Sequence, residues 1–79
     1  MIAIHKIEKI TFVSSDMIIN IDGNDLKIPL EKLSSKLKIA TDIERTMYKI
    51  SPSGYGIHWP LIDEDLSIEG IIRDFGKEL

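Results

Sequence analysis

The chain has 79 residues, of which 43% are hydrophobic and 29% are charged, and its formal net charge is −3. This length excludes a two-domain enzyme and this balance excludes a disordered chain, so we expect one small domain over residues 1–79. The chain contains no cysteine, which excludes disulfides and thiolate metal sites, and the negative charge disfavours direct binding to nucleic acid. No apolar run approaches the ~18 residues of a membrane span and no signal peptide opens the chain, so we expect a cytoplasmic protein that does not contact the membrane.

The first third of the chain predicts strands joined by a tight hairpin. Residues 10–13 and 17–21 are rich in β-branched and aromatic side chains, which favour strands. Asp22 and Gly23 tolerate the positive φ angles that a two-residue hairpin turn requires. The strand that follows ends at Pro29 or lies at a sheet edge, because proline cannot donate to a ladder. For the isoleucine-rich segment before residue 10 two interpretations stay open, a strand on the sheet or a separate arm.

The middle of the chain predicts one helix and a short helical turn. Three leucines repeat at the i, i+3, i+7 spacing of one helical face, and they predict a helix over about residues 30–38 (Leu30, Leu33 and Leu37). Thr41 and Glu44 have the spacing of a capping box, which predicts a helical turn that ends near Met47.

The last third predicts a second hairpin and a terminal helix. Residues 48–51 and 57–59 are predicted strands, joined by a turn that has proline and glycine where a type I turn favours them. Residues 67–75 predict a helix with a regular apolar face (Ile68, Ile71, Ile72 and Phe75). We therefore expect an α+β fold: a small, mostly antiparallel sheet of hairpins, one central helix over about 30–38 and one C-terminal helix over about 67–75.

Three side chains near the second hairpin are candidate contact residues or core residues. His58 and Trp59 are neighbours in a strand and so point to opposite faces; we expect Trp59 in the core and His58 outside. An exposed histidine can serve as a contact, a proton-transfer group or, less often, a metal ligand. Tyr55 is expected to stand exposed at the hairpin tip, where an aromatic side chain can anchor a partner.

The acidic run Asp63, Glu64 and Asp65 has two interpretations. Clustered carboxylates can bind a divalent cation, but the alternating oxygen spacing of a calcium loop is missing. The favoured interpretation is that the run precedes a helix N-terminus, which stabilises negative charge, with Asp65 or Ser67 as the cap. We expect no catalytic residue, no metal and no cofactor.

The block over residues 54–72 reads GYGIHWPLIDEDLSIEGII, and it resembles the bacterial domain-of-unknown-function family 2442. A looser match continues upstream to about residue 8. The resemblance implies a small α+β module without assigned catalytic residues. In some longer members of that family, the small module precedes a helix-turn-helix segment. Other members are encoded beside another small protein, an arrangement typical of toxin–antitoxin pairs.

Together these observations predict a bacterial protein-interaction module, the antitoxin-like or regulatory partner of a neighbouring gene product. We expect its contact surface at Tyr55, His58 and the run from Asp63 to Asp65, and its partner to be another small protein. Pairing of two copies through an edge strand near Ile2 or Pro29 is a further expectation. The alternatives are a nucleic-acid-associated transcriptional regulator that uses the basic helix 30–38, and a ligand- or metal-dependent enzyme at His58 and the acidic loop.

Overall fold

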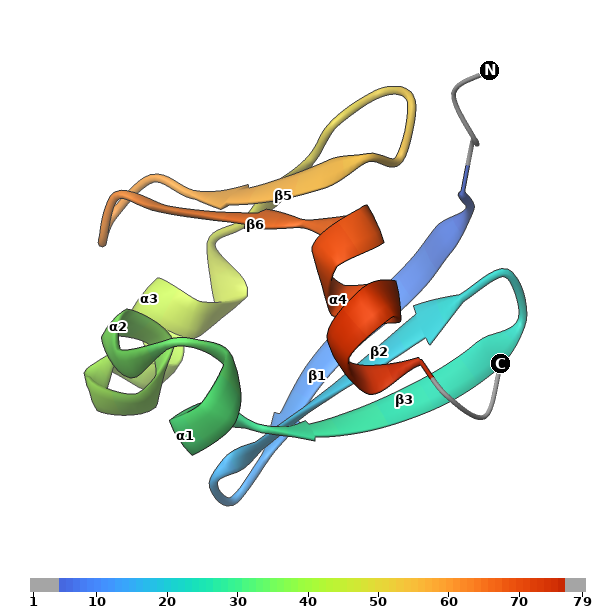
Figure 1. Ribbon diagram of the computed structural model, residues 1–79. Helices are drawn as coiled ribbons and strands as arrows, with labels where there is room; N and C mark the ends of the chain where they lie inside the picture. The colour runs from blue at the N-terminus through green and yellow to red at the C-terminus, as the bar shows by residue number, and fades with distance from the viewer. Residues whose placement is uncertain (1–4, 77–79) are drawn as a thin grey trace.

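The computed structural model describes residues 5–76, which form two antiparallel three-stranded sheets and four short helices (Figure 1). The sheets lie as two layers, with the helical segment over residues 30–46 gathered at one end (Figure 1). In chain order the elements are β1 (Ile7–Val13), β2 (Asp16–Ile21), β3 (Asn24–Pro29), α1 (Leu30–Leu33), α2 (Ser35–Ile39), α3 (Asp42–Thr46), β4 (Lys49–Ile50), β5 (Gly56–Trp59), β6 (Glu64–Ser67) and α4 (Ile68–Phe75). The predicted α+β class is confirmed, but the hairpins form two sheets rather than one.

The first sheet has the strand order β1-β2-β3 and is built by two consecutive hairpins. Asp22 and Gly23 have φ angles of 52° and 87°, as the predicted tight turn between β2 and β3 requires. Alternate side chains of β2 and β3 are buried, so one face of this sheet lies on the core. As predicted, β3 is an edge strand that ends at Pro29.

The isoleucine-rich start of the chain belongs to the sheet as far as the structure describes it. β1 begins at Ile7 and pairs with β2, with an irregular register between Ile7 and Ile10 that marks a bulge. This favours the strand interpretation over a separate arm. The proposed edge near Ile2 lies outside the described residues.

The prediction of a single central helix over 30–38 is wrong, because α1 and α2 are separated at Ser34. The backbone of Ser34 is extended, with φ −162° and ψ 117°, and its Oγ accepts a hydrogen bond from the Leu37 amide at 3.1 Å as the N-cap of α2. Leu30 and Leu37 are both fully buried. The leucine spacing therefore marked a buried stripe correctly, but the capping serine restarts the helix within it.

The second sheet has the order β4-β5-β6, and its last strand was not predicted. The acidic run does precede the N-terminus of a helix, and Ser67 rather than Asp65 is the cap, but Glu64 and Asp65 themselves lie in β6, paired with Trp59 and His58 of β5. The terminal helix is confirmed as α4. Its N-cap is Ser67, whose Oγ accepts from the Gly70 amide at 3.1 Å.

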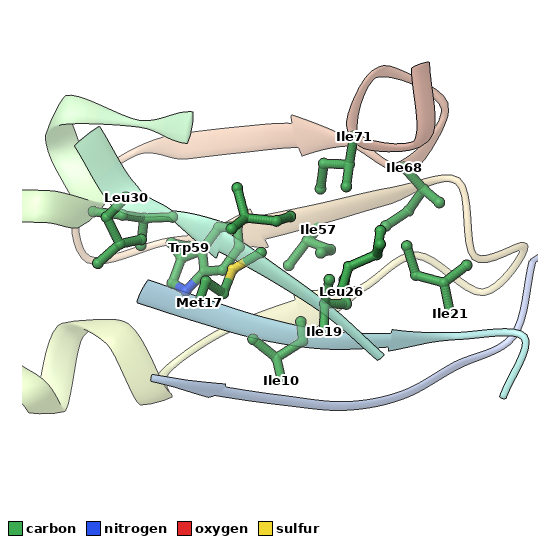
Figure 2. Close-up of a cluster of buried hydrophobic side chains, with 12 residues drawn as sticks. Ile10, Met17, Ile19, Ile21, Leu26, Leu30, Ile57, Trp59, Ile68 and Ile71 are labelled. Atoms are coloured by element: carbon green, nitrogen blue, oxygen red, sulfur yellow. The ribbon is translucent and has the colours of Figure 1, made fainter. Parts of the chain in front are cut away.

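The core lies between the two sheets and α4 (Figure 2). Trp59 and Ile57 of β5 meet the buried side chains of β2 and β3, and Ile68 of α4 completes the cluster. Trp59 is fully buried as predicted, and its indole Nε1 donates to the Arg45 carbonyl at 3.0 Å. Two of the four predicted face residues of α4, Ile68 and Ile71, are fully or almost fully buried.

Across residues 5–76, no helix is both long enough and apolar enough to cross a bilayer, and α4 has only eight residues.

Candidate functional site

The outer face of the second sheet carries a row of three polar side chains. The register pairs His58 of β5 with Lys49 of β4 on one side and with Asp65 of β6 on the other. Directly paired residues of an antiparallel sheet point to the same face, so these three side chains lie side by side. Ile57 and Trp59 point the opposite way, into the core.

Within this row, His58 and Asp65 form a hydrogen-bonded pair. His58 Nδ1 lies 2.8 Å from Asp65 Oδ1, and the two side chains are 42% and 75% exposed. Exposed pairs of this kind stabilise a fold by about 0–1 kcal/mol, so the contact orients the imidazole more than it supports the fold. Within residues 5–76, no hydrogen bond involves the other ring nitrogen, Nε2, so it can contact a ligand.

A groove of about 610 Å³ runs along this face. Its volume falls in the range of roughly 300–1,000 Å³ that is typical of ligand sites in proteins. The polar row and the exposed ring of Tyr55 border it, and the residues along it come from β4, the β4–β5 turn, β5 and β6 (Lys49, Ile50, Ser51, Pro52, Tyr55, Gly56, Ile57, His58, Asp65, Leu66 and Ser67).

The turn between β4 and β5 fixes the aromatic wall of the groove. The Gly54 amide donates to the Ser51 carbonyl at 2.8 Å, which closes the predicted turn around Pro52. Ser51 Oγ then accepts from the amides of Tyr55 and Gly56 at 3.0 and 3.1 Å. The backbone of Tyr55 is therefore held in place while its side chain stays 58% exposed.

Of the five predicted contact residues, the structure brings Tyr55, His58 and Asp65 together in the groove and places the other two elsewhere. Asp63 lies in the β5–β6 turn with φ 51°, and its carbonyl accepts from Lys36 Nζ at 2.9 Å. Glu64 Oε2 accepts from Ser34 Oγ at 2.5 Å, so this carboxylate joins β6 to the break between α1 and α2. The acidic run is therefore divided among three different roles.

His5 was not predicted as a site residue, yet its side chain contacts two carboxylates whereas that of His58 contacts one. His5 Nδ1 lies 2.8 Å from Asp22 Oδ2, and His5 Nε2 lies 2.9 Å from Glu69 Oε1. The hydrogen bond to Asp22, followed by that to Glu69, raises the pKa of His5 above its ordinary value of 6.5. The same contact, with a hydrogen bond from the Lys6 amide, lowers the pKa of Asp22. No local sequence pattern predicts this cluster, because Asp22 and Glu69 lie 17 and 64 residues from His5 in the chain.

The part of the chain that the structure describes contains no cluster of side chains suited to bind a metal ion. Within residues 5–76, no three histidine, aspartate or glutamate side chains converge in a way that could hold an ion. His5, Asp22 and Glu69 do not form such a group, because the imidazole lies between the two carboxylates.

Comparisons with known proteins agree with the fold and name no activity. The family model described as "Protein of unknown function (DUF2442)" matches residues 7–76. A crystal structure of a protein of unknown function from Rhodospirillum rubrum is similar, with a TM-score of 0.70 and 28% identity, over 94% of this chain and 93% of the other. No curated protein matches the chain.

Proposed function

This chain belongs to the DUF2442 family, and we propose that it is a protein-interaction module whose binding site is the groove on the outer face of the β4-β5-β6 sheet. The observation that carries the proposal is the exposed aromatic ring of Tyr55 standing at the wall of that groove. Tyrosine is enriched among the residues that dominate protein interfaces, since it offers a large, rigid apolar surface with a polar tip.

The lining of the groove supports a partner segment with one apolar side chain next to an acidic one. Pro52 and Tyr55 offer an apolar wall for the first. Lys49 borders the same groove, and none of the ion pairs among residues 5–76 involves its ammonium group. Asp65, the one carboxylate of the lining, is already paired with His58. A carboxylate of the partner would therefore meet an unpaired cation.

The finer form of the proposal is that the chain is the antitoxin-like or regulatory member of a two-gene pair. Its support is the family resemblance, in which some members are encoded beside another small protein. This gives the partner a concrete candidate, the product of the neighbouring gene.

Co-expression of the chain with its genomic neighbour, followed by size-exclusion chromatography with light scattering, tests this proposal. We expect co-elution at a fixed ratio. Tyr55→Ala should weaken the complex about thirtyfold in Kd, since truncation of an interface hot spot costs about 2 kcal/mol or more. Tyr55→Phe should keep most of the affinity, because it retains the ring.

The matched control is Ile43→Ala, which removes another exposed apolar side chain, from α3 and outside the groove. It should leave the Kd unchanged. A neighbour that elutes separately would contradict the gene-pair form of the proposal, and a complex that binds Tyr55→Ala as tightly as the wild type would contradict the groove as its site.

A ligand-dependent enzyme at the same groove is the second candidate, and one observation favours it. A histidine whose Nδ1 is held by a carboxylate can present Nε2 as a general base, and the His58–Asp65 pair has this arrangement. This candidate predicts that His58→Gln abolishes a defined activity without changing the unfolding temperature. The nucleic-acid alternative also stays a prediction. Its basic segment 30–38 is divided between two helices, and a gel shift with Lys32→Gln and Lys38→Gln tests it.

A further inference from the structure

His5 lies at the meeting point of segments that are far apart in the chain. Its two ring nitrogens contact Asp22, in the turn between β2 and β3, and Glu69, in the first turn of α4. The His5 side chain is only 16% exposed, whereas both carboxylates are more open to solvent. One imidazole therefore joins the segment just before β1 to a turn of the first sheet and to the terminal helix.

The two short contacts fix the number of protons on the ring. A carboxylate can only accept a hydrogen bond, and a neutral imidazole carries a single N–H. Contacts of 2.8 and 2.9 Å on both nitrogens are therefore both hydrogen bonds only if His5 is the doubly protonated imidazolium. In the neutral ring, one nitrogen lone pair would face a carboxylate oxygen at the same distance, which is repulsive.

The charged groups around His5 favour the cation. Asp22 and Glu69 are the acidic groups that face it, from the β2–β3 turn and from α4. The nearest cation along its own segment, Lys6, is paired with Glu8 at 3.0 Å. On the side of the β4–β5 turn, the neighbouring crevice is lined by Ser51, Pro52 and Gly54, none of which is charged.

The backbone next to His5 is hydrogen-bonded to the β2–β3 turn, which its side chain also contacts, and it packs against the β4–β5 turn. The Lys6 amide donates to Asp22 Oδ1 at 2.8 Å, and the Asp22 amide donates to the Lys6 carbonyl at 2.8 Å. The β4–β5 turn rests on His5 so closely that a Cβ at Gly54 would lie 1.9 Å from the His5 carbonyl oxygen. A shift of the backbone at His5 would therefore also displace the β4–β5 turn, which holds Tyr55 at the wall of the groove.

We propose that His5 is a proton-operated clamp. The imidazolium fastens the segment just before β1 to the β2–β3 turn and to α4, and loss of one proton breaks one of the two contacts and loosens that segment beneath the β4–β5 turn. The clamp needs neither a metal nor a partner, so it stands or falls independently of the proposed binding function.

Titration of the histidine ring resonances by NMR tests the proton count. In the wild-type chain we expect His5 to titrate with a midpoint above 6.5. Asp22→Asn and Glu69→Gln should each lower that midpoint, because each removes one of the two charges that hold the imidazolium. Asparagine is a matched replacement at position 22, since it tolerates the φ of 52° and its amide oxygen can still accept from Lys6. The ring of His58 contacts neither carboxylate and serves as the internal reference.

Hydrogen exchange of the Lys6 and Asp22 amides tests whether the proton operates a clamp. Corrected for intrinsic exchange, their protection should fall with the same midpoint as the His5 titration in the wild-type chain and should stay flat in His5→Gln. A His5 midpoint at or below 6.5, or one that neither carboxylate variant moves, would overturn the proposal. A raised midpoint with unchanged amide protection would overturn it too, since the ion contact would then hold nothing in place. Glu69 is 62% exposed and lies outside the β2–β3 turn, so Glu69→Gln keeps the test valid if Asp22→Asn unfolds.

Discussion

Gly54 lies where the β4–β5 turn crosses the start of β1, and no other residue type fits this position. Its φ is +70°, and a Cβ would overlap the His5 carbonyl oxygen. Gly23 has a similar φ of +87° but has open space around it. The two glycines therefore separate the cost of the backbone conformation from the cost of the overlap.

We predict that Gly54→Ala lowers the free energy of unfolding much more than Gly23→Ala does. For Gly23→Ala we expect about 1–2 kcal/mol, the cost of a left-handed backbone for alanine. For Gly54→Ala we expect at least about 3 kcal/mol, because His5 must also move aside. Urea unfolding of both variants measures the difference, and equal losses would mean that the turn does not rest on His5.

At this scale, strand periodicity predicted which way each side chain of the second hairpin points. Trp59 inside, His58 outside and Tyr55 exposed all follow from the alternation of a strand and from the turn at Pro52. His5 could not be found in this way. Its two partners are set by the docking of α4 and of a hairpin turn, which no window of neighbouring residues records.

Among the elements, the break between α1 and α2 depends on Ser34, which is almost fully buried. Its hydroxyl accepts from the Leu37 amide and donates to Glu64 Oε2, so it caps a helix and joins that helix to β6. Ser67 caps α4 in the same way, with an Oγ that accepts from Gly70. Ser34 is therefore a helix cap with an additional tertiary contact, whereas Ser67 is a helix cap without one, and the two can be compared directly.

Ser34→Ala should therefore destabilise the fold more than Ser67→Ala. Loss of a cap costs typically about 1 kcal/mol, which is our expectation for Ser67→Ala. Ser34→Ala should cost about 2–3 kcal/mol, because it also leaves the Glu64 carboxylate without its donor. Thermal or urea unfolding provides the comparison. A smaller loss for Ser34→Ala would show that the link to Glu64 adds nothing.

The elements that depend on local chemistry were predictable, and those that depend on distant pairing were not. The Asp22–Gly23 turn and the Thr41–Glu44 capping box each satisfy their own backbone groups, and both occur where expected. β6 has an acidic, weakly strand-forming sequence and becomes a strand because β5 pairs with it. Leucine spacing likewise could not reveal that a buried serine would interrupt the helix over 30–38.

Over the whole molecule, the pKa shifts of His5 and Asp22 make part of the stability depend on pH. The pKa of His5 is raised, so its contribution is complete below 6.5 and is lost as the pH rises through the raised pKa. The pKa of Asp22 is lowered, so its contribution is present above 3.8 and is lost as the pH falls through the lowered pKa. Between these limits the clamp is intact.

We predict that the unfolding temperature of the wild-type chain falls on the alkaline side of this range and that His5→Gln removes this dependence. His58→Gln is the control, because His58 pairs with the exposed Asp65, and neither residue belongs to the clamp. It should keep the wild-type slope. Thermal melts across the titration range would contradict the prediction if His5→Gln retained that slope.

The molecule has a second exposed apolar surface that competes with the groove as a partner site. Ile39 and Ile43, which belong to α2 and α3, are 84% and 71% exposed, and Met47 follows on the same segment. The groove differs from this surface because it places the exposed ring of Tyr55 beside Lys49, which forms no ion pair within residues 5–76. The two surfaces come from different elements, so one experiment can tell them apart.

The most direct test of the groove as the binding site is an NMR titration of the labelled chain with the purified product of the neighbouring gene. We predict that amide shifts gather on the β4–β5 turn and the outer row of the second sheet, at Tyr55, Gly56, His58 and Asp65, and that Tyr55→Ala weakens them. Shifts confined to the surface around Ile39 and Ile43, or no shifts at saturating concentration, would contradict it.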